Sequence, residues 1–179
     1  MRIHIDGPVS LRPVEAGDAA QRLAIGNHPD IHRMFGGDAG AFRELTPEAA
    51  EAWAKSLASE KYGWVITFKD ALVGSVRIFN VNPVDRRGSM AIGILDPEAL
   101  GKGVGTRAMR LVATEAFGPM KLNRLHVRVL AFNTPAIAAY KKVGFQVEGQ
   151  ERESAWIDGK WHDDLLMGLL ARDFESLSP

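Results

Sequence analysis

The spacing of hydrophobic residues alternates between strand period and helix period along the chain. Over 124–130, "RLHVRVL", the residues Leu125, Val127 and Val129 share one face, and this alternation predicts a strand. From about Gly103 to Phe117 hydrophobic residues recur every three or four positions, which predicts an amphipathic helix. Both element types therefore belong to the same half of the chain.

The other elements follow from the same periods and from turn residues. Strands are predicted over 8–14, 63–69, 72–81, 88–95, 145–152 and 161–170. Helices are predicted over 15–26, 46–59 and 134–143, and 27–37 is a short helix or a loop. Strands come in runs broken by single helices, so the fold class is α+β or mixed α/β rather than a doubly wound parallel sheet.

Composition narrows the class of protein. A chain of 179 residues predicts one domain over 1–179, and 22 basic residues cancel 22 acidic ones. Nucleic-acid binding normally requires a basic excess, so no such partner is expected. No stretch approaches the roughly 20 apolar residues of a membrane span, and "MRIHIDGPVSLRP" lacks the apolar run of a signal peptide. With no cysteine in the sequence, these features favour a cytoplasmic protein without a membrane partner.

The stretch "EALGKGVGTRAM" places three glycines in five positions at the start of a predicted helix. A phosphate-binding loop of the G-x-x-x-x-G-K-[ST] type does not fit, because Gly103 follows Lys102. A G-x-G-x-x-G dinucleotide signature does not fit either, because Thr106 stands at its third glycine. The first turn of a helix has unpaired N–H donors and suits an anion. The residues alone leave two interpretations open: a phosphate cradle or an ordinary helix cap.

Further motifs decide between these interpretations. "LGKGVG" resembles the Q/R-x-x-G-x-G/A signature of the GCN5-related N-acetyltransferase superfamily, with Leu100 in place of the usual Gln or Arg. "NTPAIAAYKKVGF" is similar to the N-x-x-A-x-x-x-Y-x-x-x-G-F run of that family, especially its ribosomal-protein-alanine and polyamine acetyltransferase branch. The resemblance implies a central, mostly antiparallel twisted sheet of six to seven strands flanked by about four helices.

The resemblance also implies site residues. The acyl donor would be acetyl-CoA, with its pyrophosphate on the amides of six residues: Gly101, Lys102, Gly103, Val104, Gly105 and Thr106. The backbone near Ile94 and Leu95 would pair with the pantetheine arm, and Asn133 would contact that arm. Tyr140 matches the tyrosine that protonates the departing thiolate.

The acceptor side is less marked in the sequence. An ammonium group must lose a proton before it attacks, so a general base is expected, directly or through water. Asp163 matches an acidic position of the branch and is the predicted base, ahead of His126, Glu44 and His28. His28 and His32 have a helical metal spacing, but Pro29 intervenes and no third ligand is near, so no metal is expected.

Taken together, the motifs predict transfer of an acetyl group from acetyl-CoA to a primary amine. The acceptor is a small molecule, either a polyamine or an amino-compound, or a protein N-terminus. A homodimer is an expectation that the family resemblance supplies. The alternatives are a non-catalytic acyl-CoA-binding sensor on the same fold and a nucleotide-binding module.

Overall fold

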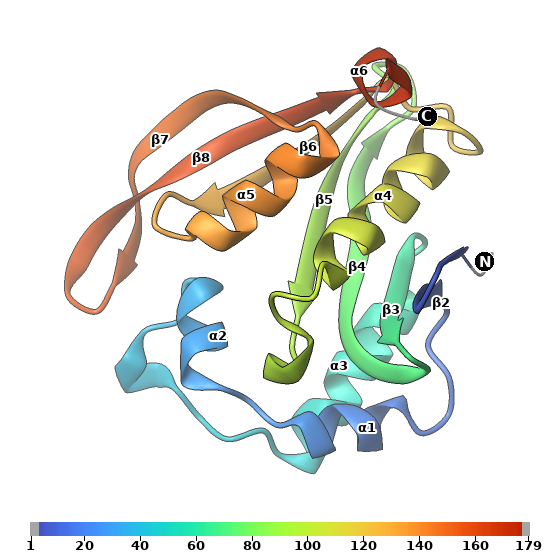
Figure 1. Cartoon of the computed structure of the whole chain (residues 1–179). Coiled ribbons are helices and arrows are strands. Elements are labelled where there is room, and N and C mark those ends of the chain that lie inside the picture. Colours follow the sequence, from blue (N-terminus) through green and yellow to red (C-terminus); the bar gives the residue numbers. More distant parts are fainter. Residues whose placement is uncertain (1–3, 177–179) are drawn as a thin grey trace.

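The computed structural model describes residues 4–176, which build one eight-stranded sheet (Figure 1). The strands lie in the order β1-β2-β3-β4-β5-β6-β8-β7, and only β5 and β6 run parallel. Their bounds are β1 His4–Asp6, β2 Val9–Arg12, β3 Gly63–Phe68, β4 Ala71–Asn82, β5 Arg87–Ile94, β6 Arg124–Leu130, β7 Gln146–Ile157 and β8 Lys160–Leu170.

Within the described residues six α-helices accompany the sheet: α1 Asp18–Ile25, α2 Pro29–Met34, α3 Pro47–Ser59, α4 Val104–Phe117, α5 Thr134–Val143 and α6 Ala171–Ser176. Two 3₁₀ turns, Ala39–Ala41 and Pro97–Ala99, lie in the connections. The side chain of Thr46 accepts a hydrogen bond from the Ala49 N–H at 3.2 Å and caps α3, as its position before Pro47 indicates. No helix among the described residues is long and apolar enough to cross a membrane.

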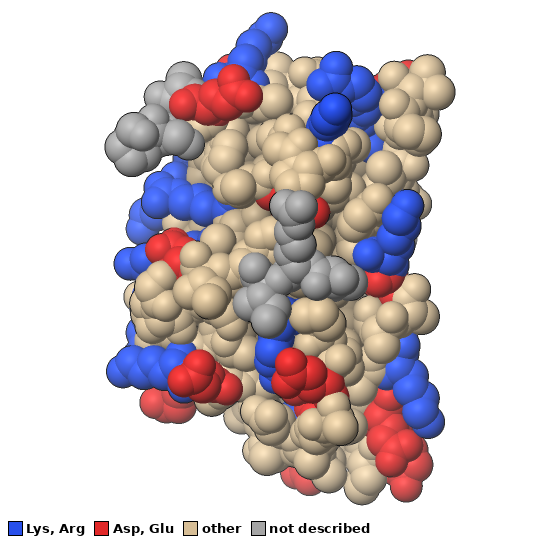
Figure 2. All heavy atoms as spheres, turned by 90° about the vertical axis from the view of Figure 1, so that its right-hand side faces the viewer, with Lys and Arg blue, Asp and Glu red and all other residues tan. Residues whose placement is uncertain are grey.

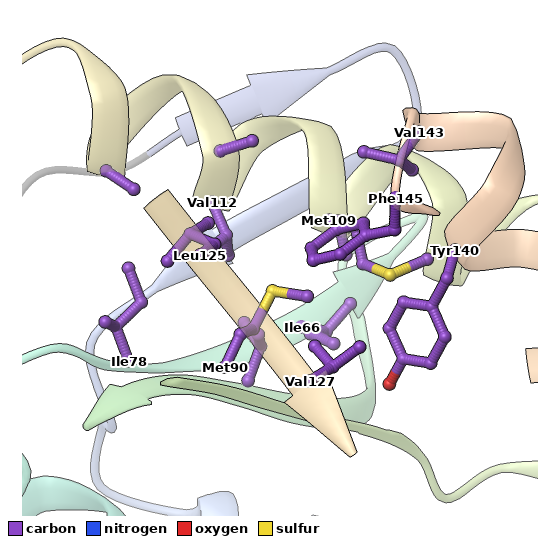
Figure 3. Packing of buried hydrophobic residues seen from close by; sticks show 14 of the residues in the cluster. Ile66, Ile78, Met90, Met109, Val112, Leu125, Val127, Tyr140, Val143 and Phe145 are labelled. Carbon is purple, nitrogen blue, oxygen red and sulfur yellow. The ribbon is translucent and has the colours of Figure 1, made fainter. Parts of the chain in front are cut away.

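The alternation of β3 distributes hydrophobic residues to both faces of the sheet. Trp64 and Ile66 belong to the main core, which includes the buried face of α4, whereas Val65 packs with Leu57 of α3 and Leu72. Helices α4 and α3 therefore cover opposite faces of the sheet. Figure 3 shows how side chains from α4, α5 and the strands β3 to β6 meet in the main core.

The parallel pairing of β5 with β6 is short. It joins Arg87–Ser89 to Arg124–His126 and ends there, while β5 stays paired with β4 as far as Ile94. Strand β6 continues to Leu130 as a partner of β8 alone. The two strands consequently diverge, and their backbones form a V between the two halves of the sheet (Figure 1). We call the space between the unpaired strand edges the opening.

Charged side chains of both signs share the surface. On the face that Figure 2 shows, the basic and acidic side chains are interspersed. This distribution agrees with the balance of 22 basic and 22 acidic residues in the whole sequence. The face in view presents no extended region of a single sign.

The predicted mixed fold is confirmed, and β3 and β4 form a hairpin whose turn holds Lys69 and Asp70 at φ values of 51° and 68°. Between residues 4 and 176 the sheet has eight strands rather than six to seven, and there are six α-helices rather than about four. The additional elements are too short to show a hydrophobic period: β1 has 3 residues, and α2 and α6 have 6 each.

Helix α1 begins three residues later than the sequence predicts because Asp18 organises the turn before it. The Asp18 carboxylate is fully buried and accepts hydrogen bonds from Arg12 Nη1 and Nη2 at 2.8 and 2.7 Å and from the Glu15 N–H at 2.7 Å. Burial by itself would raise the pKa of Asp18, but these hydrogen bonds and the charge of Arg12 together hold that pKa below its ordinary value.

We expect Asp18→Asn to destabilise the fold by about 3–5 kcal/mol at pH 7, because it leaves the Arg12 guanidinium without its anion. A lowered pKa contributes stability above the pKa of the unfolded chain, and this contribution disappears as the pH falls through the folded value. The difference between wild type and variant should therefore shrink on acidification below about pH 4. Urea unfolding at pH 7 and pH 3 measures it.

Glu51→Gln provides the control. Glu51 pairs with Lys55 at 3.4 Å on an exposed surface of α3, with both side chains more than half exposed. Exposed pairs of this kind contribute little, so stability should change by less than about 1 kcal/mol at either pH. Equal losses in the free energy of unfolding for Asp18→Asn and Glu51→Gln would show that the buried Arg12–Asp18 pair contributes no more than an exposed pair.

Candidate active site

The edge of β5 that faces the opening offers backbone hydrogen-bonding groups. Leu95 N–H donates to the Val73 carbonyl of β4 at 2.7 Å, so the groups of alternate residues are directed toward β4. Even-numbered residues are directed the other way: the Arg86 carbonyl accepts a hydrogen bond from the Asn123 N–H at 2.6 Å on the β6 side. By this alternation Ile94 directs its N–H and C=O into the opening. Of the two residues predicted to pair with a pantetheine arm, Ile94 has this orientation and Leu95 does not.

The glycine turn lies between the end of β5 and helix α4. Gly103 is the N-cap residue of α4, with φ 77°, and no side chain caps the helix. The first-turn N–H groups of α4 therefore lack the side-chain acceptor that Thr46 supplies to α3. No acidic residue lies in that first turn, so the positive end of the helix dipole is uncompensated there. An anion is the complementary ligand for this geometry.

Positive φ angles favour glycine at two of the three glycine positions of this turn and not at the third. A Cβ at Gly101 or Gly103 would meet nothing within 4 Å, and the positive φ values of 72° and 77° are what favour glycine at these positions. Gly105 has an ordinary φ, and its Cβ would lie 3.7 Å from Ile94 Cγ1, a normal contact. The same turn exposes Lys102, and the side chain of Leu100 is 48% exposed.

Helix α5 begins at Asn133 and carries Tyr140. The Asn133 Oδ1 accepts from the Ala136 N–H at 3.2 Å and caps the helix, while its Nδ2 donates to the Met34 carbonyl of α2 at 3.1 Å. Asn133 is buried, and its amide joins α5 to α2. Contact between Asn133 and a cofactor arm remains a prediction.

Tyr140 lies against the main core, with its ring in an edge-to-face arrangement with Phe145 at 5.5 Å between centroids. Figure 3 shows its hydroxyl pointing away from Val143 and Phe145. Within residues 4–176 no protein group forms a hydrogen bond with that hydroxyl. Burial raises the pKa of Tyr140 to about 12, so the phenol keeps its proton at neutral pH and is able to donate it.

Asp163 has contacts that tie it to β7. Its carboxylate accepts from the Glu153 N–H at 2.7 Å and from the Gln150 side-chain amide. Glu153 has φ 53° and lies in the irregular stretch between Glu151 and Ala155, where β7 shifts register against β8. These hydrogen bonds, with the backbone one contributing most, lower the pKa of Asp163 and make it a weaker proton acceptor.

The neighbouring Asp164 is buried instead. It accepts from the Ser154 hydroxyl at 2.8 Å and lies 3.3 Å from Arg128 Nε. The acidic pair on β8 thus serves the packing of the β7–β8 hairpin, and neither carboxylate is brought to Tyr140 by a contact in the described part of the chain.

His126 lies where the parallel pairing ends. It is the register partner of Ser89, the last paired residue of β5, and its Nε2 lies 2.9 Å from the Ser89 hydroxyl. Burial, and then the charges of Arg124 and Arg87, lower the pKa of His126. A neutral imidazole therefore stands at the closed end of the opening at pH 7.

Helix α2 and the loop after it cross from β5 to the β7–β8 hairpin. Phe35 lies on β5 at Gly93, where a Cβ would come within 2.8 Å of the phenyl ring. Farther along, the Asp158 N–H donates to Asp38 Oδ2 at 2.9 Å, and the Ala39 N–H donates to Asp158 Oδ1 at 2.7 Å. These contacts place the N-terminal third of the chain against both sides of the opening.

A cavity of about 110 Å³ lies beside the end of β5, between α1 and α2. Sequence reasoning missed its most unusual wall residue, Arg22, since a single basic residue in a helix carries no motif. His28 and His32 both line this cavity, and each ring places Nε2 near a backbone carbonyl, that of Ile25 at 2.9 Å and that of Asp38 at 3.1 Å. Among the described residues no three side chains are grouped to hold a metal ion.

The mixed sheet, which divides where β5 and β6 separate, defines an acyltransferase class of fold. Residues 9–146 match the model of the acetyltransferase (GNAT) domain family, and the chain belongs to that family. It is an acetyl-CoA-dependent N-acetyltransferase, as the sequence motifs predict.

Named relatives agree with this membership. The chain is 29% identical over 168 residues to spermidine N(1)-acetyltransferase of Escherichia coli (strain K12), covering 93% of this chain and 88% of the relative. The crystal structure of spermidine N-acetyltransferase from Vibrio cholerae in complex with CoA and spermine superposes with a TM-score of 0.78. That match has 21% identity and covers 95% of this chain and 99% of the other.

A second solved structure shows how far the fold extends beyond these relatives. The Microcin C7 self-immunity acetyltransferase MccE, solved with acetyl-CoA and AMP, has a TM-score of 0.77 at 15% identity. The match covers 92% of this chain and 93% of that one. At such low identity the likeness concerns the fold alone.

Replacing Gly103, which has a positive φ, and Gly105, which has an ordinary φ, with alanine should change the stability of the protein in opposite directions. We expect Gly103→Ala to destabilise the protein by about 1–2 kcal/mol, because an alanine is strained at positive φ although its Cβ has room. Gly105→Ala is the matched control, and it should stabilise the protein by about 0.5–1 kcal/mol through helix propensity. Urea unfolding of the ligand-free protein tests both. A loss in Gly105→Ala as large as that in Gly103→Ala would contradict the assigned reasons.

Proposed function

We propose that this protein transfers the acetyl group of acetyl-CoA directly to a primary amine, with Tyr140 as the general acid. The acceptor is a small molecule, a polyamine or another amino-compound, or a protein N-terminus. The observation that carries this proposal is the neutral, buried Tyr140, whose pKa is raised to about 12 and whose hydroxyl has no hydrogen-bond partner within residues 4–176. We also propose that the whole chain forms one acetyltransferase domain.

The co-substrate would occupy the opening between β5 and β6. Its pyrophosphate would accept hydrogen bonds from amides of 101–106, where helix α4 lacks a side-chain cap. Its pantetheine arm would run along β5 and pair with the N–H and C=O of Ile94 in the manner of an added strand. The thioester would then lie between β5 and α5, the helix that carries Tyr140.

The chemistry needs one proton donor and one proton exit. The amine nitrogen attacks the thioester carbonyl carbon, forming a C–N bond, and the C–S bond then breaks. The leaving thiolate takes the proton of the Tyr140 hydroxyl, which contributes about 10²–10⁴-fold in rate. The proton that the nitrogen loses passes through water and restores the phenol. The products are the N-acetyl amine and CoA with a free thiol.

Asp163 has little capacity for the role of base, because its carboxylate is held by Glu153 and Gln150 and its pKa is lowered. We therefore propose that the acceptor reaches the site as the free amine, with water as the group that accepts its proton. The imidazole of His126, at the closed end of the opening, is neutral at pH 7. It therefore adds no positive charge to the opening through which the proton of the amine would leave.

Tyr140→Phe should lower kcat by about 10²–10⁴-fold while the affinity for acetyl-CoA changes little, because only the proton donor is removed. Release of the CoA thiol measures turnover, and the absence of cysteine keeps that signal free of protein background. Calorimetry measures acetyl-CoA binding. Tyr62→Phe, the other tyrosine of the chain, is the matched control and should keep full turnover.

Two other outcomes have distinct meanings. An unchanged kcat for Tyr140→Phe would remove Tyr140 as the acid. If acetyl-CoA binds but no amine of a broad panel releases CoA, the sensor alternative replaces the enzyme.

The pH profile provides a separate test of the acid. A raised pKa means that the Tyr140 hydroxyl stays protonated until the pH nears 12, so deprotonation of this acid should not limit turnover at pH 9 to 10. We expect kcat/KM to rise with pH as the amine loses its proton, without a fall by pH 10. A fall of kcat/KM centred below pH 9 would contradict the buried environment assigned to Tyr140, provided that Tyr62→Phe shows the same fall and Tyr62 is thereby excluded as its cause.

A further inference from the structure

The cavity between α1 and α2 has a buried positive charge in its wall. Arg22 of α1 is 7% exposed and lines the cavity together with the end of β5 at Leu95. Burial lowers the pKa of Arg22, and no charged neighbour acts on it in the opposite direction. An arginine remains charged in proteins, so the cavity wall holds a cation whose charge no carboxylate within residues 4–176 balances.

The guanidinium also has unused hydrogen-bonding capacity. Nη1 donates to the Gly26 carbonyl at 2.5 Å and Nη2 donates to Asn27 Oδ1 at 2.6 Å. Nε is buried and has no partner among the residues that the structure describes. Two of the five N–H donors are therefore used within residues 4–176, and both bonds hold the group in place at the C-terminal end of α1.

A comparison with Arg12 shows what this arrangement lacks. Arg12, on β2, also belongs to the N-terminal third, and it is neutralised by the buried carboxylate of Asp18 through two hydrogen bonds. Both partners of Arg22 are neutral: a backbone carbonyl and an amide oxygen. Burying a charge without a counter-ion is costly, so a balancing group from outside the chain would be stabilised at this position.

The cavity has room and a suitable place for such a group. Its volume of about 110 Å³ is far more than one water needs, and Phe35 forms part of its wall. Phe35 lies against Gly93 of β5, so the cavity adjoins the strand along which the thioester would lie. A ligand in this cavity would therefore be a part of the acceptor.

We propose that Arg22 forms an anion subsite and that the acceptor amine carries a carboxylate or phosphate group. This inference rests on the proposed acetyl transfer and specifies its substrate class. The guanidinium pairs with two oxygens of the anionic group, which holds the acceptor so that its amine points along β5 toward the thioester. A polyamine would bring further positive charge to this wall and would be repelled.

Matched acceptors test this inference. The panel contains an amino acid, its carboxamide, the corresponding amine without the carboxyl group, an aminoalkyl phosphate and spermidine, each assayed by release of the CoA thiol. We expect kcat/KM for an anionic acceptor to exceed that of its neutral counterpart by about 10–100-fold. The carboxylate and phosphate arms distinguish the two kinds of anion. Faster turnover of spermidine than of every anionic acceptor would overturn the proposal.

Arg22→Gln should reduce the ratio of kcat/KM for the anionic acceptor over its neutral counterpart by about 10–100-fold, and Arg22→Lys by less. Both rates come from one preparation, so partial unfolding of the variant cancels in the ratio. Arg43→Gln is the control, because Arg43 donates to the Gly40 and Phe42 carbonyls on the surface and lies outside the cavity wall. An unchanged ratio in Arg22→Gln would overturn the proposal.

A binding measurement completes the design. In the presence of CoA, the anionic acceptor should raise the unfolding temperature of the wild type and of Arg43→Gln but not of Arg22→Gln. If every acceptor is inactive while this shift persists in the wild type, the proposed transfer fails and the anion subsite stands. If neutral amines are turned over as well as anionic ones, the subsite fails and the transfer stands.

Discussion

The short parallel contact between β5 and β6 is the constraint on which the rest of the site depends. Three residues of each strand pair, and then β6 follows β8 while β5 follows β4. A longer pairing would close the sheet and leave no exposed strand edge for an extended ligand. A shorter one would remove the connection that holds the two halves at a fixed spacing. The position of Ser89 and His126 therefore determines where the opening begins.

Contacts from the N-terminal third keep the opening at a defined width. The Asn133 amide joins α5 to the Met34 carbonyl, and Asp158 of the β7–β8 turn exchanges hydrogen bonds with the Asp38–Ala39 segment. None of these contacts belongs to the hydrogen-bond ladder of the sheet. The half with β6 to β8 is thus connected to the half with β1 to β5 by the base of the V, by the main core in which α4 and α5 pack together, and by α2 with its loop. Residues of α2 also form part of the wall of the cavity beside β5, so the segment that joins the two halves also shapes that cavity.

The sequence predicts the helices and strands that have local signals. It misses the features that depend on contacts between residues far apart in the chain. The period of "RLHVRVL" and the Thr46-Pro47 helix start are local signals, and the structure contains the corresponding strand and helix. The capping role of Asn133 appears only in the structure. The divergence of β5 from β6 has no local signal, because both strands keep the same alternation on either side of the branching point. The orientation of Leu95 depends on its register with Val73, which the sequence does not reveal.

Candidate residues for the chemistry divide in the same way. Tyr140 lies on a helix whose motif spans thirteen positions, and its burial is a consequence of packing next to Phe145. Asp163 resembles a functional acid in sequence, yet its hydrogen bonds to Glu153 and Gln150 support a bulge that no periodicity predicts. Arg22 is the reverse case. No motif in the sequence points to it, and only the three-dimensional structure shows that it is buried beside a cavity.

Gly93 has a consequence for how such a protein diversifies. Because position 93 has no side chain, the ring of Phe35 rests directly on β5, and any larger residue there would push α2 away from the strand. The spacing between α2 and β5 is therefore set by a missing side chain at position 93 rather than by the residues that line the neighbouring cavity. Substitutions in α1 and α2 can change the lining of that cavity while this spacing stays constant.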